Sequence, residues 1–115
     1  MPHRKVLFRL KHKHELLHNF ENIVYNELLY MGYHLQVYHD GSHEIDFVAV
    51  KGNKQYFIQA AYSVAEEKAY EREFGAFAKL DNTHQKIVIT NDDLDYSTSN
   101  IRHIRFRDFV LMNEL

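Results

Sequence analysis

The centre of the chain is organised by two apolar runs that flank a short turn. Residues 44–62 read EIDFVAVKGNKQYFIQAAY, and the turn is Lys51-Gly52-Asn53-Lys54. Both faces of each run are mostly apolar, which is typical of strands covered on both sides. Glycine and asparagine between apolar runs favour a tight hairpin. The pattern therefore predicts two neighbouring strands inside a sheet that carries a layer on each face.

Two polar residues interrupt these predicted strands. Strict alternation places Asp46 on one face with Val48 and Val50, and it places Gln59 on one face with Phe57. A buried carboxylate or amide costs several kcal/mol unless it finds a partner. The two residues therefore indicate either a hydrogen-bonded polar network or a functional site.

An amphipathic helix is predicted over residues 15–31, ahead of the strands. Its apolar residues recur at helical spacing and form one stripe, which Gly32 ends as a C-terminal capping glycine: Leu17, Val24, Leu28 and Met31. Glu21 lies in the middle of that stripe. Its carboxylate either faces the sheet or turns to the periphery, and the pattern alone leaves both open.

The remaining pattern predicts three more strands and two more helical segments. Strands are expected at residues 33–39, 86–90 and 101–106, and a final short helix or turn at 108–112. A helix is expected from Ser63, as N-cap with Glu66 completing a capping box, to about Leu80. Its charged residues are predicted to form a solvated face with i,i+4 pairing: Glu66, Glu67, Glu71, Arg72 and Glu73.

This order of elements predicts an α/β fold. The first three strands form antiparallel hairpins, and the second predicted helix is a right-handed crossover between parallel strands. A mixed sheet with helices on both faces follows.

Composition and charge narrow the range of possible protein classes. The chain has 115 residues, a net charge of −2 and no cysteine, which predicts one domain without a disulfide or thiolate metal site. Residues 1–13 contain five basic residues and no acid, so they are expected to form a basic N-terminal arm that is solvated or contacts phosphates. Residues 14–115 form the single domain. The sequence contains no apolar run of the roughly 18 residues that a membrane span needs. We therefore expect a cytoplasmic location and no contact with a membrane.

Glu21 in the first helix, Asp46 in the second strand and Gln59 in the third resemble the restriction-endonuclease-like (PD-(D/E)XK) superfamily. Its signature is a Glu, then an Asp, then (Glu/Gln)-x-Lys. More narrowly, FENIVYNELLYMGY, EIDFVAV, YFIQAAYSV, ERE and KIVIT are similar to the C-terminal nuclease-like domain of a prokaryotic AAA+ ATPase family of unknown function. The resemblance covers about residues 16–112. The sequence lacks a GxxxxGK[ST] nucleotide-binding loop.

The resemblance implies an αβββαβ core and a site for Mg²⁺ or Mn²⁺. Asp46 and Glu21 would hold the cation, with Gln59 and the Ala60 carbonyl completing the ligand set. The position of the superfamily's catalytic lysine is occupied by Ala61, which can neither orient nor activate a water molecule. A displaced lysine could substitute for it, but neither Lys54 nor Lys68 is well placed by spacing.

We therefore expect a degenerate nuclease-like domain, with Glu21, Asp46 and Gln59 as remnants of the catalytic set. Such a domain would bind nucleic acid or protein without cleaving it. The alternatives are a Mg²⁺- or Mn²⁺-dependent nuclease with a rearranged site, or a homo-oligomerisation domain. Four tyrosines are candidates for an aromatic surface patch that contacts a protein partner or a second copy: Tyr25, Tyr30, Tyr33 and Tyr38.

Overall fold

The computed structural model describes residues 13–40 and 43–115, and its side chains over 19–39 and 44–115. Most of the expected basic arm, residues 1–12, lies outside the described residues. The helices are α2 (Lys13–Tyr30), α3 (Glu67–Gly75) and α4 (Phe106–Phe109). The strands are β1 (His34–Asp40), β2 (His43–Lys51), β3 (Lys54–Ala60), β4 (Gln85–Thr90) and β5 (Arg102–Arg105).

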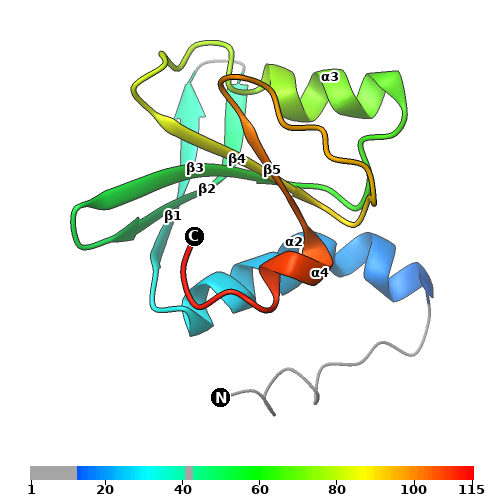
Figure 1. Cartoon of the computed structure of the whole chain (residues 1–115), viewed down its shortest axis with the longest axis horizontal. Coiled ribbons are helices and arrows are strands. Elements are labelled where there is room, and N and C mark those ends of the chain that lie inside the picture. Colours follow the sequence, from blue (N-terminus) through cyan, green and yellow to red (C-terminus); the bar gives the residue numbers. More distant parts are fainter. Residues whose placement is uncertain (1–12, 41–42) are drawn as a thin grey trace.

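The strands form one mixed sheet in the order β1-β2-β3-β4-β5. The β1–β2 and β2–β3 pairs are antiparallel, and the β3–β4 and β4–β5 pairs are parallel. Helices α2 and α4 cover one face and α3 covers the other (Figure 1). The predicted α/β class, the mixed sheet and the placement of helices on both faces are confirmed.

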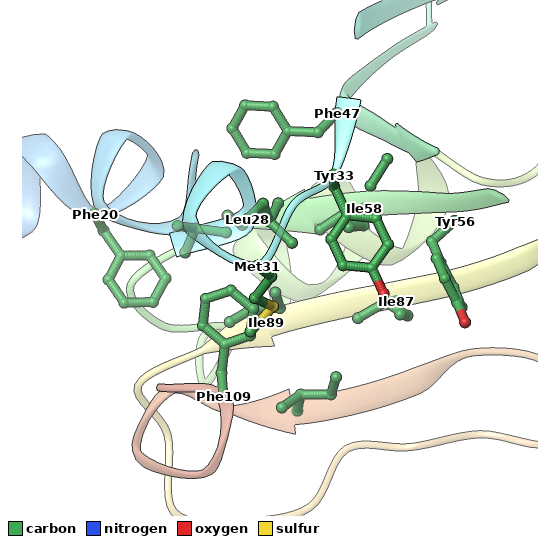
Figure 2. Close-up of a cluster of buried hydrophobic side chains, with 14 residues drawn as sticks. Phe20, Leu28, Met31, Tyr33, Phe47, Tyr56, Ile58, Ile87, Ile89 and Phe109 are labelled. Atoms are coloured by element: carbon green, nitrogen blue, oxygen red, sulfur yellow. The ribbon is translucent and has the colours of Figure 1, made fainter. Parts of the chain in front are cut away.

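Two apolar cores lie on opposite faces of this sheet. The α2-side core joins α2 and α4 to the sheet and includes Phe20, Leu28, Phe47, Ile58, Ile87 and Phe109 (Figure 2). The α3-side core joins α3 to the other face and includes Ile45, Val48, Phe57, Phe74, Phe77 and Val88. Because β2, β3 and β4 supply residues to both cores, their apolar character on both faces has its physical explanation.

A β-bulge changes the direction of side chains in β2. Gln36 pairs with Val48 and Tyr38 pairs with Ile45, so β2 carries one residue more than β1 over this interval. As a result, Ile45 packs in the α3-side core while Phe47 packs in the α2-side core. The strict alternation predicted from the sequence is therefore wrong around Asp46.

Gly32 caps the C-terminal end of α2 as predicted, and it has a φ of 98°. The Gly32 N–H donates to the Leu29 carbonyl at 3.0 Å and the Tyr33 N–H donates to the Leu28 carbonyl at 3.1 Å. These two bonds form a Schellman motif, in which a glycine adopts the left-handed conformation without the penalty of a Cβ. The stop fixes where the chain enters β1.

The start of α3 differs from the prediction. Glu66 is the N-cap, without a side-chain capping bond, and the helix ends at Gly75. The Ser63 hydroxyl instead donates to Asp92 Oδ1 at 2.6 Å and accepts the Ala65 N–H at 3.1 Å. The capping box is wrong because Asp92, distant in the sequence, competes for the serine.

The four candidate tyrosines do not form one surface patch. Tyr25 and Tyr30 are exposed on α2, whereas Tyr33 is buried in the α2-side core and Tyr38 packs against the α3-side core. In the part of the chain that the structure describes, no helix is both long enough and apolar enough to cross a membrane.

Candidate functional site

Strands β2 and β3 separate at Asp46 and Gln59, and side chains replace the missing ladder bonds there. Their regular pairing reaches Phe47 and Ile58. Beyond this point the Asp46 N–H donates to Gln59 Oε1 at 2.6 Å, and the Ala60 N–H donates to Asp46 Oδ2 at 2.9 Å. Both side chains therefore satisfy main-chain donors that would otherwise lack partners.

The Asp46 carboxyl also forms a side-chain hydrogen bond with Glu21 of α2. The pKa of Asp46 is raised to about 8, first by burial and then by the bond to Glu21 and its negative charge, while the Ala60 N–H opposes the rise. At neutral pH the Asp46 carboxyl is therefore mostly protonated. The structure brings Glu21 and Asp46 together as predicted, although Glu21 remains solvent-exposed.

Glu73 of α3 extends this network from the other side of Gln59. Gln59 Nε2 donates to Glu73 Oε1 at 3.2 Å, and Arg72 Nε donates to Glu73 Oε2 at 3.2 Å. Burial raises the pKa of Glu73, and the Arg72 guanidinium opposes that rise. Glu73 is only 8% exposed, so its assignment to a solvated helix face is wrong.

These residues line a cavity of about 600 Å³ at the C-terminal end of β3. Its wall contains Glu21, Glu44, Asp46, Gln59, Ala60, Glu71, Arg72 and Glu73, together with Gly75 and Ala76. Five carboxyl groups thus face one guanidinium. Such a charge balance suits a cation and repels a phosphate group. Ligand sites of open α/β sheets also lie at the carboxyl ends of strands.

No lysine lines this cavity in the described part of the chain. Ala61, at the lysine position, packs against the α3-side core and its N–H donates to the Ile89 carbonyl at 3.1 Å. Lys54 and Lys68 are also absent from the cavity wall. The positively charged side chain in the cavity wall is instead Arg72. Its side chain is 67% exposed and already bonded to Glu73.

The expected metal ligands are only partly arranged for Mg²⁺ or Mn²⁺. Asp46 and Glu21 offer two adjacent carboxyl groups, but the Gln59 oxygen already accepts the Asp46 N–H. Across residues 13–40 and 43–115, no cluster of three or more His, Asp or Glu side chains could hold a metal ion. The side chains present do not fit a complete cation site, because hard cations require several oxygen ligands from protein, water or substrate.

The sequence pattern did not predict the burial of Glu73, because its helix is rich in charged residues. The signal was nonetheless present: Glu73 lies at helical spacing between Tyr70 and Phe77 and next to Phe74, all of which pack on the α3-side core. An acid within such a stripe is expected to be buried. Glu44 and Arg72 carried no comparable signal, because the wall of the cavity exists only in the folded chain.

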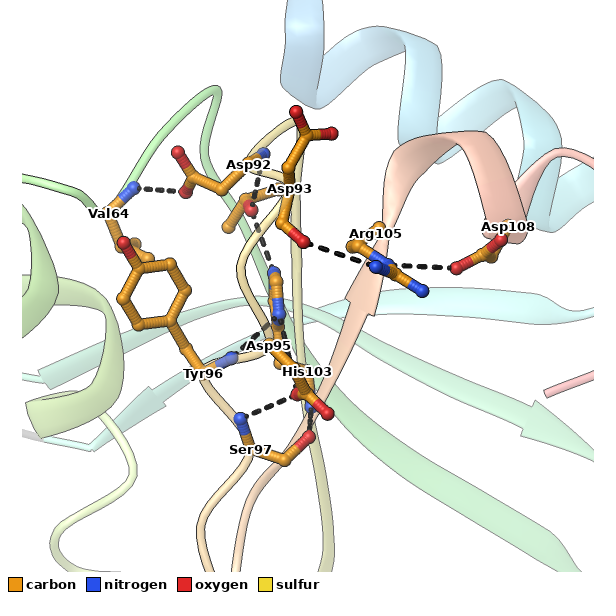
Figure 3. A network of polar contacts seen from close by, with 10 residues as sticks. Val64, Asp92, Asp93, Asp95, Tyr96, Ser97, His103, Arg105 and Asp108 are labelled. Atoms are coloured by element: carbon orange, nitrogen blue, oxygen red, sulfur yellow. Dashed lines mark hydrogen bonds and ion pairs between the residues drawn. The ribbon is translucent and has the colours of Figure 1, made fainter.

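A second polar network holds the loop between β4 and β5 (Figure 3). None of the residues labelled there lines the cavity. The Tyr96 N–H donates to His103 Nδ1 at 3.1 Å, and His103 Nε2 lies 2.8 Å from Thr90 Oγ1. A backbone N–H can only donate, so Nδ1 is unprotonated and Nε2 carries the proton. This fixed, neutral histidine joins the loop to both parallel strands.

Comparisons with known proteins assign a family and no activity. The model of a domain of unknown function, DUF4143, matches residues 18–109, which include most of α2, the whole sheet and the cavity residues described above. No curated protein and no solved structure matches the chain. The chain therefore belongs to the DUF4143 family of domains of unknown function.

Proposed function

We propose that this domain is a degenerate member of the restriction-endonuclease-like class that binds nucleic acid or protein without cleaving it. In this proposal it is related to the C-terminal part of prokaryotic AAA+ ATPases. Its resemblance to the PD-(D/E)XK class rests on Glu21, Asp46 and Gln59, which lie around one cavity. Their present role is to hold helices and sheet together.

The observation that carries the proposal is the position of Ala61. Its methyl group packs against the α3-side core instead of the cavity, and no lysine among the described residues borders the cavity. Hydrolysis of a phosphodiester needs a group that positions and activates water. Arg72 is a poor substitute because a guanidinium stays protonated and cannot accept a proton.

The hydrogen bonds of the site support a structural role. Asp46 joins α2 to β3 through Glu21 and the Ala60 N–H. Gln59 joins β2 to α3 through the Asp46 N–H and Glu73. A buried network in which each member has a partner rigidifies a fold. The residues of a nuclease site would thus persist without catalysis.

The test is a cleavage assay with labelled single- and double-stranded DNA and RNA, in Mg²⁺ and separately in Mn²⁺. Asp46→Asn, which retains the acceptor for the Ala60 N–H, controls for contaminating nucleases. We expect intact substrate with both proteins. Cleavage by the wild type that disappears in the Asp46→Asn variant would overturn the proposal.

A second candidate is a divalent-cation-dependent nuclease with a rearranged site. The excess of carboxyl groups over cationic groups in the cavity favours it. Cations are commonly held by one or two carboxylates together with substrate phosphates, and Asp46 and Glu21 supply such a pair. The same assay separates the candidates, because only this one predicts products that require Asp46.

A further inference from the structure

Two further hollows lie at the opposite end of the parallel strands from the cavity around Asp46, Gln59 and Glu73. We call that cavity the acidic cavity. One hollow has a volume of about 440 Å³ and the other about 510 Å³, and they share Thr83, His84 and Gln85 in their walls. Together they form one groove along the starts of β3, β4 and β5. We call it the basic groove and define it by Lys54, His84, Lys86, Thr98, Ser99 and Arg102.

The basic groove has the reverse charge of the acidic cavity. Lys54, Lys86 and Arg102 line it, and no aspartate or glutamate among the described residues does so. In the same part of the chain, neither Lys54 nor Arg102 has a carboxylate partner in an ion pair. Their charges are therefore available to a ligand.

Asp81 lies beside the groove, and its carboxylate is occupied by neighbouring donors. Its Oδ1 accepts hydrogen bonds from the Thr83 N–H at 3.0 Å and the Thr83 hydroxyl, and it lies 2.9 Å from His84 Nδ1. These bonds lower the pKa of Asp81 to about 2, so its negative charge persists.

The sheet sets the spacing of the cationic groups. Ile87 pairs with Ile58 on one side and with Arg102 on the other, so Arg102 is level with a residue four positions after Lys54. With adjacent strands about 4.8 Å apart and a rise of about 3.3 Å per residue, the main-chain positions of Lys54 and Arg102 are about 16 Å apart. That distance covers about five phosphates along one strand, at about 3.4 Å each.

Polar groups on the loops add uncharged donors between the cations. Thr98 and Ser99 come from the loop before β5, and Asn82 and Thr83 come from the loop before β4. Lys86 is buried and its Nζ donates to the Leu80 carbonyl at 3.0 Å, so it adds a fixed positive charge beneath the groove. Hydroxyl, amide and cationic groups in one groove are the usual contacts of a nucleic-acid backbone.

We propose that the basic groove binds the phosphodiester backbone of a nucleic acid. The inference rests on the proposed function as a non-cleaving binding module, and it assigns that module a partner and a surface. Binding at this end of the sheet keeps the phosphates away from the five carboxyl groups of the acidic cavity. The domain would therefore hold nucleic acid on the side opposite the remnants of the nuclease site.

The experiment measures binding of a fluorescein-labelled oligothymidylate to the full chain by anisotropy over a range of salt concentrations. The test variant is Lys54→Gln/Arg102→Gln. The matched control is Lys68→Gln/Arg107→Gln, which removes one exposed lysine and one exposed arginine outside the groove. We expect the test variant to weaken binding about tenfold and to reduce the salt slope by about 1.4, at about 0.7 per phosphate contact.

Three results would overturn the inference. The first is equal binding by the test and control variants, or no binding by the wild type. The second is binding that depends only on the N-terminal arm, measured with Arg4→Gln/Lys5→Gln/Arg9→Gln. The third is displacement of the oligonucleotide by inorganic phosphate at an ionic strength far below the one at which chloride displaces it. That result would identify a small phosphate ligand.

The same mixtures, incubated with Mg²⁺ and run on a denaturing gel, separate this inference from the proposed function. If the oligonucleotide stays intact and its binding does not depend on the groove residues, only the inference is overturned. Oligonucleotide that is cut by the wild type and spared by Asp46→Asn overturns the proposed function instead.

Discussion

Asp46 and Gln59 are joined where β2 and β3 separate: the Asp46 N–H donates to Gln59 Oε1 at 2.6 Å. Asp46 in turn accepts the next main-chain donor of β3, the Ala60 N–H. Each strand therefore supplies a side chain that replaces a ladder bond of the other. The separation opens the acidic cavity without leaving these buried main-chain donors unpaired.

Removing the Gln59 amide should destabilise the fold. In Gln59→Leu the Asp46 N–H loses its acceptor and Glu73 loses a donor, so we expect a loss of about 2–4 kcal/mol in the free energy of unfolding. Urea denaturation followed by circular dichroism measures it. The control is Gln55→Leu, an exposed position of the same strand. Equal stability of the two variants would contradict a structural role for Gln59.

Asp46 should make the protein less stable as the pH rises from about 4 to about 8. Its pKa is raised from 3.8 to about 8, so the folded state binds the proton that the unfolded state releases over this interval. For one such proton, the free energy of unfolding falls by up to about 1.4 kcal/mol for each unit that the pH rises. Asp46→Asn should remove this contribution.

The measurement is the free energy of unfolding of both proteins across that pH range. The difference between the two profiles isolates Asp46 from Glu73 and His103, which also titrate with shifted pKa values. A difference that does not change with pH would show that the Asp46 carboxyl is ionised throughout and would refute its raised pKa.

His103 should titrate below its ordinary pKa and remain in one tautomer. Burial lowers its pKa from 6.5, and its Nδ1 accepts the Tyr96 N–H. The unfolded state therefore takes up the proton first, and stability falls as the pH drops below about 6.5. Nitrogen NMR of the imidazole should report the Nε2–H tautomer at neutral pH. A pKa at or above 6.5, or the Nδ1–H tautomer, would contradict the network of Figure 3.

Restoring the missing lysine should not restore cleavage. In Ala61→Lys the new side chain would start from a methyl group packed against the α3-side core, so we expect it to lower stability by about 1–3 kcal/mol. Thermal melting and the labelled-substrate assay measure the two effects. A stable Ala61→Lys protein that cuts DNA would mean that this position reaches the cavity.

Local pattern was sufficient for the elements and their order. Apolar runs on both faces predicted a two-sided sheet, and the helical segment between β3 and β4 predicted their parallel pairing. Gly32 predicted the end of α2. These features depend on neighbouring residues or on rules for short connections, which is why the sequence alone determined them.

Only the tertiary structure decided the site. The bulge in β2 depends on its register with β1 and turned Asp46 toward Glu21, whereas alternation had grouped it with Val48. Burial of Glu73 depends on how α3 lies on the sheet, and the loss of Ser63 as a cap depends on Asp92. The separation of an acidic cavity from a basic groove likewise exists only after folding, because each gathers charges from segments that are distant in the sequence.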